Sequence, residues 1–162
     1  MLAHLGMSDW GAAARAIHVL SVVVWIGGVS FMTTVVLPAG RGKAPKEWAR
    51  EFEAYERRFS RQARGAVLLA LLSGLYMLYR YDMWERFSQA GDWWMHLMVG
   101  VWLLFAIALF IVEPLIRRRA ARGAAGPAPE ASLALMLRLH RIALAVSLFA
   151  VLAAVAGSHG LF

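Results

Sequence analysis

Four long apolar stretches, separated by shorter polar segments, dominate the pattern of hydrophobic and polar positions along the chain. A helix needs about 20 mainly apolar residues to cross the hydrocarbon core of a bilayer. Arginines at the ends of such a stretch can extend to the interface, so a span can include them. We therefore predict an all-α, up-and-down bundle of four transmembrane helices, at about residues 12–38, 61–81, 93–116 and 132–158.

Basic residues are concentrated in two of the three segments that connect the predicted helices. The chain has 17 Lys and Arg against 10 Asp and Glu, which gives a net charge of +7. Eight basic residues lie in 41–64 and six in 117–141, so only three remain elsewhere. Because cytoplasmic loops carry an excess of Lys and Arg, we predict two cytoplasmic loops, at 39–60 and 117–131. Both termini are then periplasmic, in a multi-pass protein of the bacterial inner membrane.

The first cytoplasmic segment has an internal pattern of its own. Its residues 47–64 are typical of an amphipathic helix that leads into the second span. Trp48, Phe52, Tyr55 and Phe59 recur at three- and four-residue spacing and form one stripe, which we expect to lie on the inner membrane surface. Later in the chain, GAAGPAP from residue 123 predicts a flexible linker.

Composition supports a membrane protein and limits its chemistry. Hydrophobic residues make up 60% of the chain, against about 45–50% in a typical soluble domain, so part of the apolar surface must face lipid. The basic residues lie between apolar runs, which excludes the basic face of a nucleic-acid-binding protein. The chain has no Cys, which excludes disulfides, iron–sulfur clusters and covalently attached haem.

Histidines are the main candidate ligands for a metal or haem, because polar groups inside a bilayer are costly and usually functional. His18 and His96 enter the predicted bundle from the same outer side, and His159 closes the fourth helix at that side. Two imidazoles that face each other across a bundle can hold a flat macrocycle. His140 lies at the inner end, where it either ligates a second centre or pairs with an inner-face residue such as Glu113.

Other side chains suggest further binding roles. Arginines and tyrosines pair with haem propionates, which makes Arg15 and Tyr76 candidates on the outer side and Arg58 and Arg64 candidates on the inner side. Thioethers together with imidazoles suit Cu(I). Methionines fall at or near the outer face at positions 1, 7, 83, 95 and 98. Besides a haem protein and a copper protein, a third interpretation is a structural or assembly subunit whose histidines bind nothing.

Several motifs resemble the short, four-helix members of the CopD-like (copper resistance D) membrane proteins. They are Ile17-His18-Val19-Leu20, Val24-Trp25-Ile26-Gly27-Gly28, Arg57-Arg58-Phe59, Gln62-Ala63-Arg64, Gly74-Leu75-Tyr76-Met77-Leu78, Trp93-Trp94-Met95-His96, Glu113-Pro114-Leu115, Leu139-His140 and Gly157-Ser158-His159-Gly160. The family name implies copper transport or resistance. The related HemJ-type protoporphyrinogen oxidases bind haem b through a first-helix histidine, which His18 would match. They also depend on a lysine early in the second helix, and this chain has none after Lys46.

The sequence therefore predicts a membrane haem b protein with one or two haems and bis-histidine ligation. His18 is the expected first axial ligand, with His96 as the second and His159 as its competitor. The expected role is electron transfer, quinone-linked oxidoreduction or haem handling, with quinone or a periplasmic redox protein as partner. A copper-binding or copper-transport protein that uses the outer His and Met groups is the alternative. Small residues on the fourth helix would permit a homo-oligomer.

Overall fold

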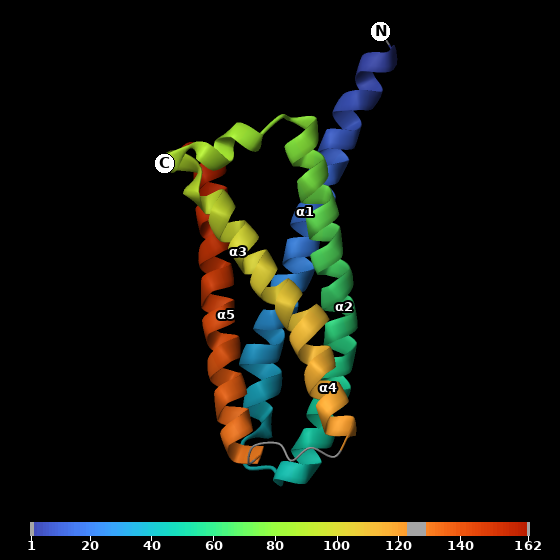
Figure 1. Ribbon diagram of the computed structural model, residues 1–162, viewed down its shortest axis with the longest axis vertical. Helices are drawn as coiled ribbons and strands as arrows, with labels where there is room; N and C mark the ends of the chain where they lie inside the picture. The colour runs from blue at the N-terminus through green and yellow to red at the C-terminus, as the bar shows by residue number, and fades with distance from the viewer. Residues whose placement is uncertain (1, 123–128, 162) are drawn as a thin grey trace.

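The described chain is built from long helices joined by short connections (Figure 1). The computed structural model describes the backbone of residues 2–122 and 129–161. Its α-helices are α1 (Leu2–Phe31), α2 (Pro45–Arg80), α3 (Trp93–Ile107), α4 (Glu113–Ala121) and α5 (Pro129–Ser158). Between them lie two π-helical segments, η1 (Met32–Val36) and η5 (Ala108–Val112), and three 3-10-helical segments, η2 (Leu37–Gly40), η3 (Trp84–Ser88) and η4 (Ala90–Asp92).

In the described part of the chain, four helical stretches are long and apolar enough to cross a membrane. They are Trp10–Gly40, Glu47–Arg80, Ala90–Arg119 and Ala134–Ser158. Their outward surfaces are apolar: the side chains of Leu72, Ile116 and Leu152 are 63%, 61% and 69% exposed. Extended apolar surface of this kind is unfavourable in water, and lipid accommodates it. The prediction of an all-α membrane bundle with four spans is confirmed.

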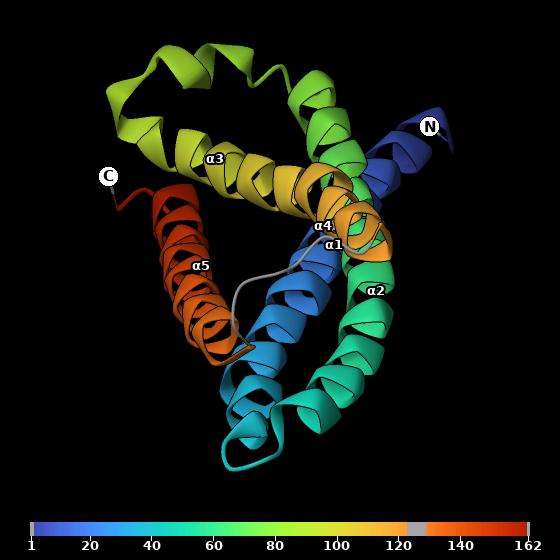
Figure 2. The ribbon, with the colours of Figure 1, turned by 60° about the horizontal axis from the view of Figure 1, so that its bottom comes forward.

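The four spans pack as two pairs, α1 with α2 and α3 with α5, and the α1–α2 interface is the larger. As the chain continues from α3 into α4, it crosses from α5 toward α2 (Figures 1 and 2). Trp25, Val67, Val101 and Ala150, one from each span, belong to a shared central core. The start of α1 and the end of α5 both lie at the upper end of the bundle in Figure 1, on opposite sides, and α4 lies at the lower end.

Most of the predicted connection 39–60 is helical, as the amphipathic helix expected over 47–64 implies. Helix α2 begins at Pro45, so only residues 41–44 separate it from η2. Helix α2 is continuous and includes the predicted amphipathic segment. Trp48 and Phe52 are buried against the π-helical end of the first span, so this part of the stripe packs on protein rather than on the membrane surface.

The second predicted loop, 117–131, begins and ends in helix. Helix α4 continues to Ala121 and α5 begins at Pro129. The predicted flexible linker, residues 123–129, falls outside the described residues except for Pro129. The third span therefore extends through η5 and α4, which carries Glu113 and Arg117 past the side of α2.

Candidate functional site

His18 lies on α1 with its imidazole against α2. Its Nδ1 is 2.9 Å from the Ala70 carbonyl oxygen and 3.2 Å from Ser73 Oγ. Because a carbonyl oxygen can only accept, Nδ1 carries the proton and donates it to Ala70. Nε2 of the neutral imidazole then holds the free lone pair. Metal-binding histidines commonly have this arrangement, in which a carbonyl holds one ring nitrogen and orients the other toward the metal.

Helix α2 is shaped to receive this imidazole. The Ser73 hydroxyl donates to the Leu69 carbonyl oxygen, 2.5 Å away, which leaves its lone pairs available to the His18 N–H. A Cβ atom at Gly74 would lie 3.3 Å from Cε1 of His18, closer than ordinary van der Waals contact. Glycine at position 74 therefore lets α1 and α2 approach while the ring stays between them.

A second polar group occurs on the His18 face of α1. Trp25 lies seven residues after His18, about 10 Å further along the helix on the same side. Its side chain is 3% exposed and packs edge-on against Phe105 of α3, with ring centroids 4.9 Å apart. Its indole N–H has no hydrogen-bond partner among the described residues. A buried, unpaired donor of this kind suits a bound molecule that carries an acceptor.

The structure does not bring His96 or His159, the other two histidines predicted at the outer side, into contact with His18. His96 is exposed near the start of α3 and packs edge-on against Phe87, with ring centroids 5.3 Å apart. His159 is exposed after the end of α5, where its Nδ1 donates to the Val155 carbonyl oxygen at 2.8 Å. In the described ranges, no group of three or more His, Asp or Glu side chains is arranged to hold a metal ion.

His140 lies near the lower end of α5 and is partly buried. Its Nδ1 donates to the Met136 carbonyl oxygen, 2.9 Å away on the same helix. The Glu113 carboxylate, the alternative partner predicted for His140, accepts hydrogen bonds from Ser60 and Arg117. At the upper end, the Arg15 guanidinium lies over the Tyr81 ring at 5.9 Å, and Tyr76 is 40% exposed.

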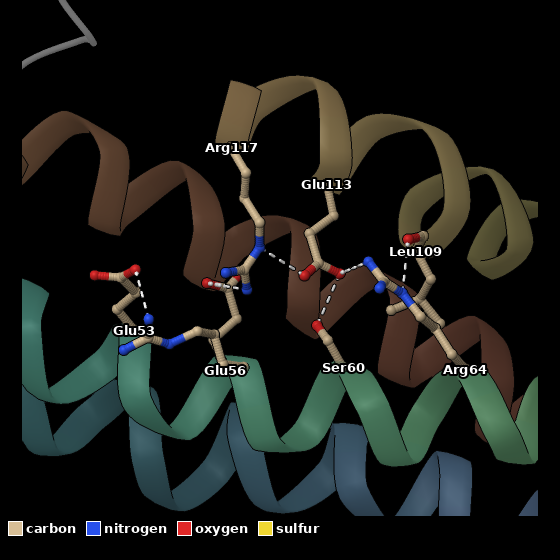
Figure 3. A network of polar contacts seen from close by, with 8 residues as sticks. Glu53, Glu56, Ser60, Arg64, Leu109, Glu113 and Arg117 are labelled. Carbon is tan, nitrogen blue, oxygen red and sulfur yellow. Dashed lines mark hydrogen bonds and ion pairs between the residues drawn. The ribbon is translucent and has the colours of Figure 1, made fainter. Parts of the chain in front are cut away.

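A network of charged side chains joins α2 to α4 near the lower end of the bundle. Glu113 is at its centre, with 12% of its side chain exposed. Its Oε2 accepts from Ser60 Oγ at 2.8 Å and lies 3.3 Å from Nη2 of Arg64. Its Oε1 accepts from Nε of Arg117 at 2.9 Å. Figure 3 shows the carboxylate between the two guanidinium groups, with Arg117 also facing Glu56 at 3.8 Å.

The π-helical segment η5 supplies the remaining contact of this network. The Glu113 N–H bonds to the Ala108 carbonyl oxygen, one residue further back than in an α-helix. Pro114, the next residue, has no N–H to donate. The Leu109 carbonyl oxygen is thereby left without a helical donor, and Nε of Arg64 donates to it at 3.1 Å. Local widening of a helix into a π-turn is frequent at functional sites.

We call Glu56, Ser60, Arg64, Leu109, Glu113 and Arg117 the carboxylate network. Sequence reasoning assigned Arg64 to propionate pairing and named Glu113 only as a possible partner of His140, so it missed their contact. Two signals were present. Glu113 is an acid inside an apolar run, and Pro114 follows it directly, which predicts a disturbed helical ladder at that point.

Comparison with known proteins gives one match. Residues 20–125 match the model of a family described as a domain of unknown function, DUF4149. No curated protein and no solved structure matches the chain. The matched segment begins two residues after His18 and contains every member of the carboxylate network.

Proposed function

Because the matched segment covers well over half of it, the chain belongs to the DUF4149 family, and we propose that this multi-pass membrane protein binds haem b and takes part in electron transfer. One observation carries the proposal. The Nδ1–H of His18 is held by the Ala70 carbonyl oxygen, so Nε2 is the ring nitrogen left to ligate iron. The imidazole is partly buried between two spans, and this environment limits access of water to a bound haem.

The second axial ligand is expected from the same end of the bundle. His96 and His159 are the candidates, and both side chains are exposed, so either can turn without breaking a buried contact. Bis-imidazole ligation gives a low-spin iron that exchanges single electrons. Arg15 and Tyr76 remain the proposed propionate partners at this end, while His140, with Arg58 and Arg64, would serve a second haem at the lower end.

The biological role that suits this arrangement is quinone-linked electron transfer in the bacterial inner membrane. The unpaired indole N–H of Trp25, on the same face as His18, is a donor for a quinone carbonyl oxygen. Haem handling, with a periplasmic protein as donor or acceptor, is the other role that such a site would serve. In both roles the residues of this chain bind and orient the group and exclude water.

The test is spectroscopic. The protein is expressed with haem supply and purified in detergent, and we expect a Soret band with sharp α and β bands on dithionite reduction. His18→Ala should abolish the Soret band, whereas the matched control His4→Ala should leave it unchanged. Either His96→Ala or His159→Ala should convert the low-spin spectrum to a high-spin one. The haem-to-protein ratio distinguishes one haem from two.

Three results would contradict the proposal. An unchanged spectrum in His18→Ala would show that another residue ligates the iron. A colourless protein with stoichiometric copper would favour the copper alternative, with the outer Met and His groups as ligands. A protein that takes up neither haem nor copper would indicate a structural or assembly role.

A further inference from the structure

A cavity of about 700 Å³ opens between α2 and α4, beside the carboxylate network. Five arginines line it, at positions 57, 58, 61, 64 and 117, and Glu113 is the acidic residue of its wall. Positions 57, 61 and 64 share one face of α2, because residues separated by three, four and seven positions are aligned along a helix. The arginine cluster is thus a product of helix packing as well as of sequence.

The acidic side chains nearby do not neutralise this cluster. Glu113 is shared by Arg64 and Arg117. Glu56 also pairs with Arg117. Arg57 has an exposed partner in Glu53, at 3.6 Å. The remaining two arginines of the cavity wall, positions 58 and 61, form no ion pair with any residue that the structure describes.

We propose that this cavity binds a phosphate group through Arg58 and Arg61. Guanidinium groups bind phosphate oxygens through paired N–H donors, and these two lie one helical turn apart, with no acidic partner to compete. Glu113 pairs with Arg64 of α2 and Arg117 of α4, so the two sides of the cavity stay joined when the anion is absent. This site is independent of haem binding at His18, and it replaces the role of Arg58 as a partner of a second haem.

The phosphate group has two chemical sources, a headgroup of an anionic lipid and a soluble phosphorylated molecule. Basic pockets between transmembrane helices commonly bind anionic headgroups on the cytoplasmic side. The cavity lies at the end of the bundle that the basic loops mark as cytoplasmic, and its volume exceeds what a single phosphate ion fills. The experiment therefore has one arm for each source.

In the lipid arm, the full-length protein is delipidated in a neutral detergent, and native mass spectrometry measures its binding of phosphatidylglycerol against phosphatidylcholine. In the soluble arm, inorganic phosphate is added without lipid, and the midpoint of thermal unfolding is recorded. We expect wild-type protein to retain phosphatidylglycerol preferentially if the source is a lipid. We expect a concentration-dependent rise of the midpoint with inorganic phosphate if the source is soluble.

The test variant is the double substitution Arg58→Gln and Arg61→Gln. Each arginine near an anionic surface contributes about a fivefold gain in affinity, so the pair should weaken binding about 30-fold. The matched control is Arg118→Gln with Arg119→Gln, which removes the same charge from exposed positions on α4 outside the cavity wall. That control should change the affinity by about twofold or less, because surface charges off the site are screened.

Two outcomes would overturn the proposal: no binding in either arm, or an equal loss of affinity in both double variants, which would indicate only a general effect of charge. If the glutamine variant does not accumulate, Arg58→Lys with Arg61→Lys replaces it. Lysine keeps the charge and loses the paired donors. The proposal therefore requires this variant to bind the phosphate group more weakly than wild type while the protein keeps its stability. Wild-type affinity in this variant would also overturn the proposal.

Discussion

Removing the charge of Glu113 is the sharpest test of how α4 is held against α2. Glu113→Gln keeps the size of the side chain and an oxygen that can accept from Ser60, while it removes the partner charge of Arg64 and Arg117. Removing one member of a fully buried ion pair costs about 3–5 kcal/mol in soluble proteins. Here the two arginine side chains remain 34% and 35% exposed, so water compensates for part of the loss.

Measured polar contacts between membrane helices are also weaker than burial alone suggests, about 0.6 kcal/mol on average. Glu113→Gln, which removes two charged contacts of a side chain that is 12% exposed, should therefore lower the free energy of unfolding by about 2 kcal/mol. Titration of mixed micelles with SDS measures this quantity. Glu53→Gln is the control, because its pair with Arg57 is more than half exposed on both sides and should be worth less than about 0.5 kcal/mol.

The reasoning would be refuted if Glu113→Gln cost no more than Glu53→Gln. It would also be refuted if Arg64→Gln showed no coupling to Glu113→Gln in a double-mutant cycle, because groups in one network must interact. A coupling energy of about 1 kcal/mol is expected. The comparison with Arg57 and Glu53 separates a buried network from an ordinary surface pair.

Two further changes test the packing. Gly157→Leu should destabilise the protein by about 2 kcal/mol, because even a Cβ atom there overlaps the buried Trp94 indole. In the control Gly65→Ala, the added Cβ meets no neighbouring atom, so the free energy of unfolding should be unchanged or slightly raised. Equal losses in the two variants would contradict the contact between Gly157 and Trp94. Pro114→Ala restores a backbone N–H beside η5 that can donate to the Leu109 carbonyl oxygen, which otherwise accepts from Arg64. The cost of Arg64→Gln should therefore fall by about 0.5–1 kcal/mol in that background. An unchanged cost in the same SDS titration would argue against this account of the π-turn.

The candidate sites show where sequence reasoning succeeds and where it ends. His18 was identified because an imidazole inside an apolar run is unusual, and this judgement needs only local sequence. Its partner, the Ala70 carbonyl oxygen, is 52 residues away, and backbone groups leave no mark in the sequence. For the same reason the sequence left two roles open for His140, whose observed partner is the Met136 carbonyl oxygen.

The aromatic stripe on α2 is a second instance. Spacing showed that Trp48 and Phe52 share a face, and this is correct for any helix. An apolar face is satisfied equally by lipid and by protein, so the pattern could not decide between the membrane surface and the end of the first span. In the structure Trp48 and Phe52 pack on protein, because the π-helical end of the first span presents apolar side chains opposite them.

The sequence by itself determined that this protein is helical and membrane-embedded and that its spans number four, because these properties depend on the length and polarity of continuous segments. The predicted direction of the bundle has the same local origin in the distribution of Lys and Arg. Only the tertiary structure decided which helices pair, that Ser60 and Arg64 meet Glu113, and that five arginines border one cavity. These contacts depend on the rotation of each helix about its axis, which is set when the helices pack and is weakly encoded where most outward faces are uniformly apolar.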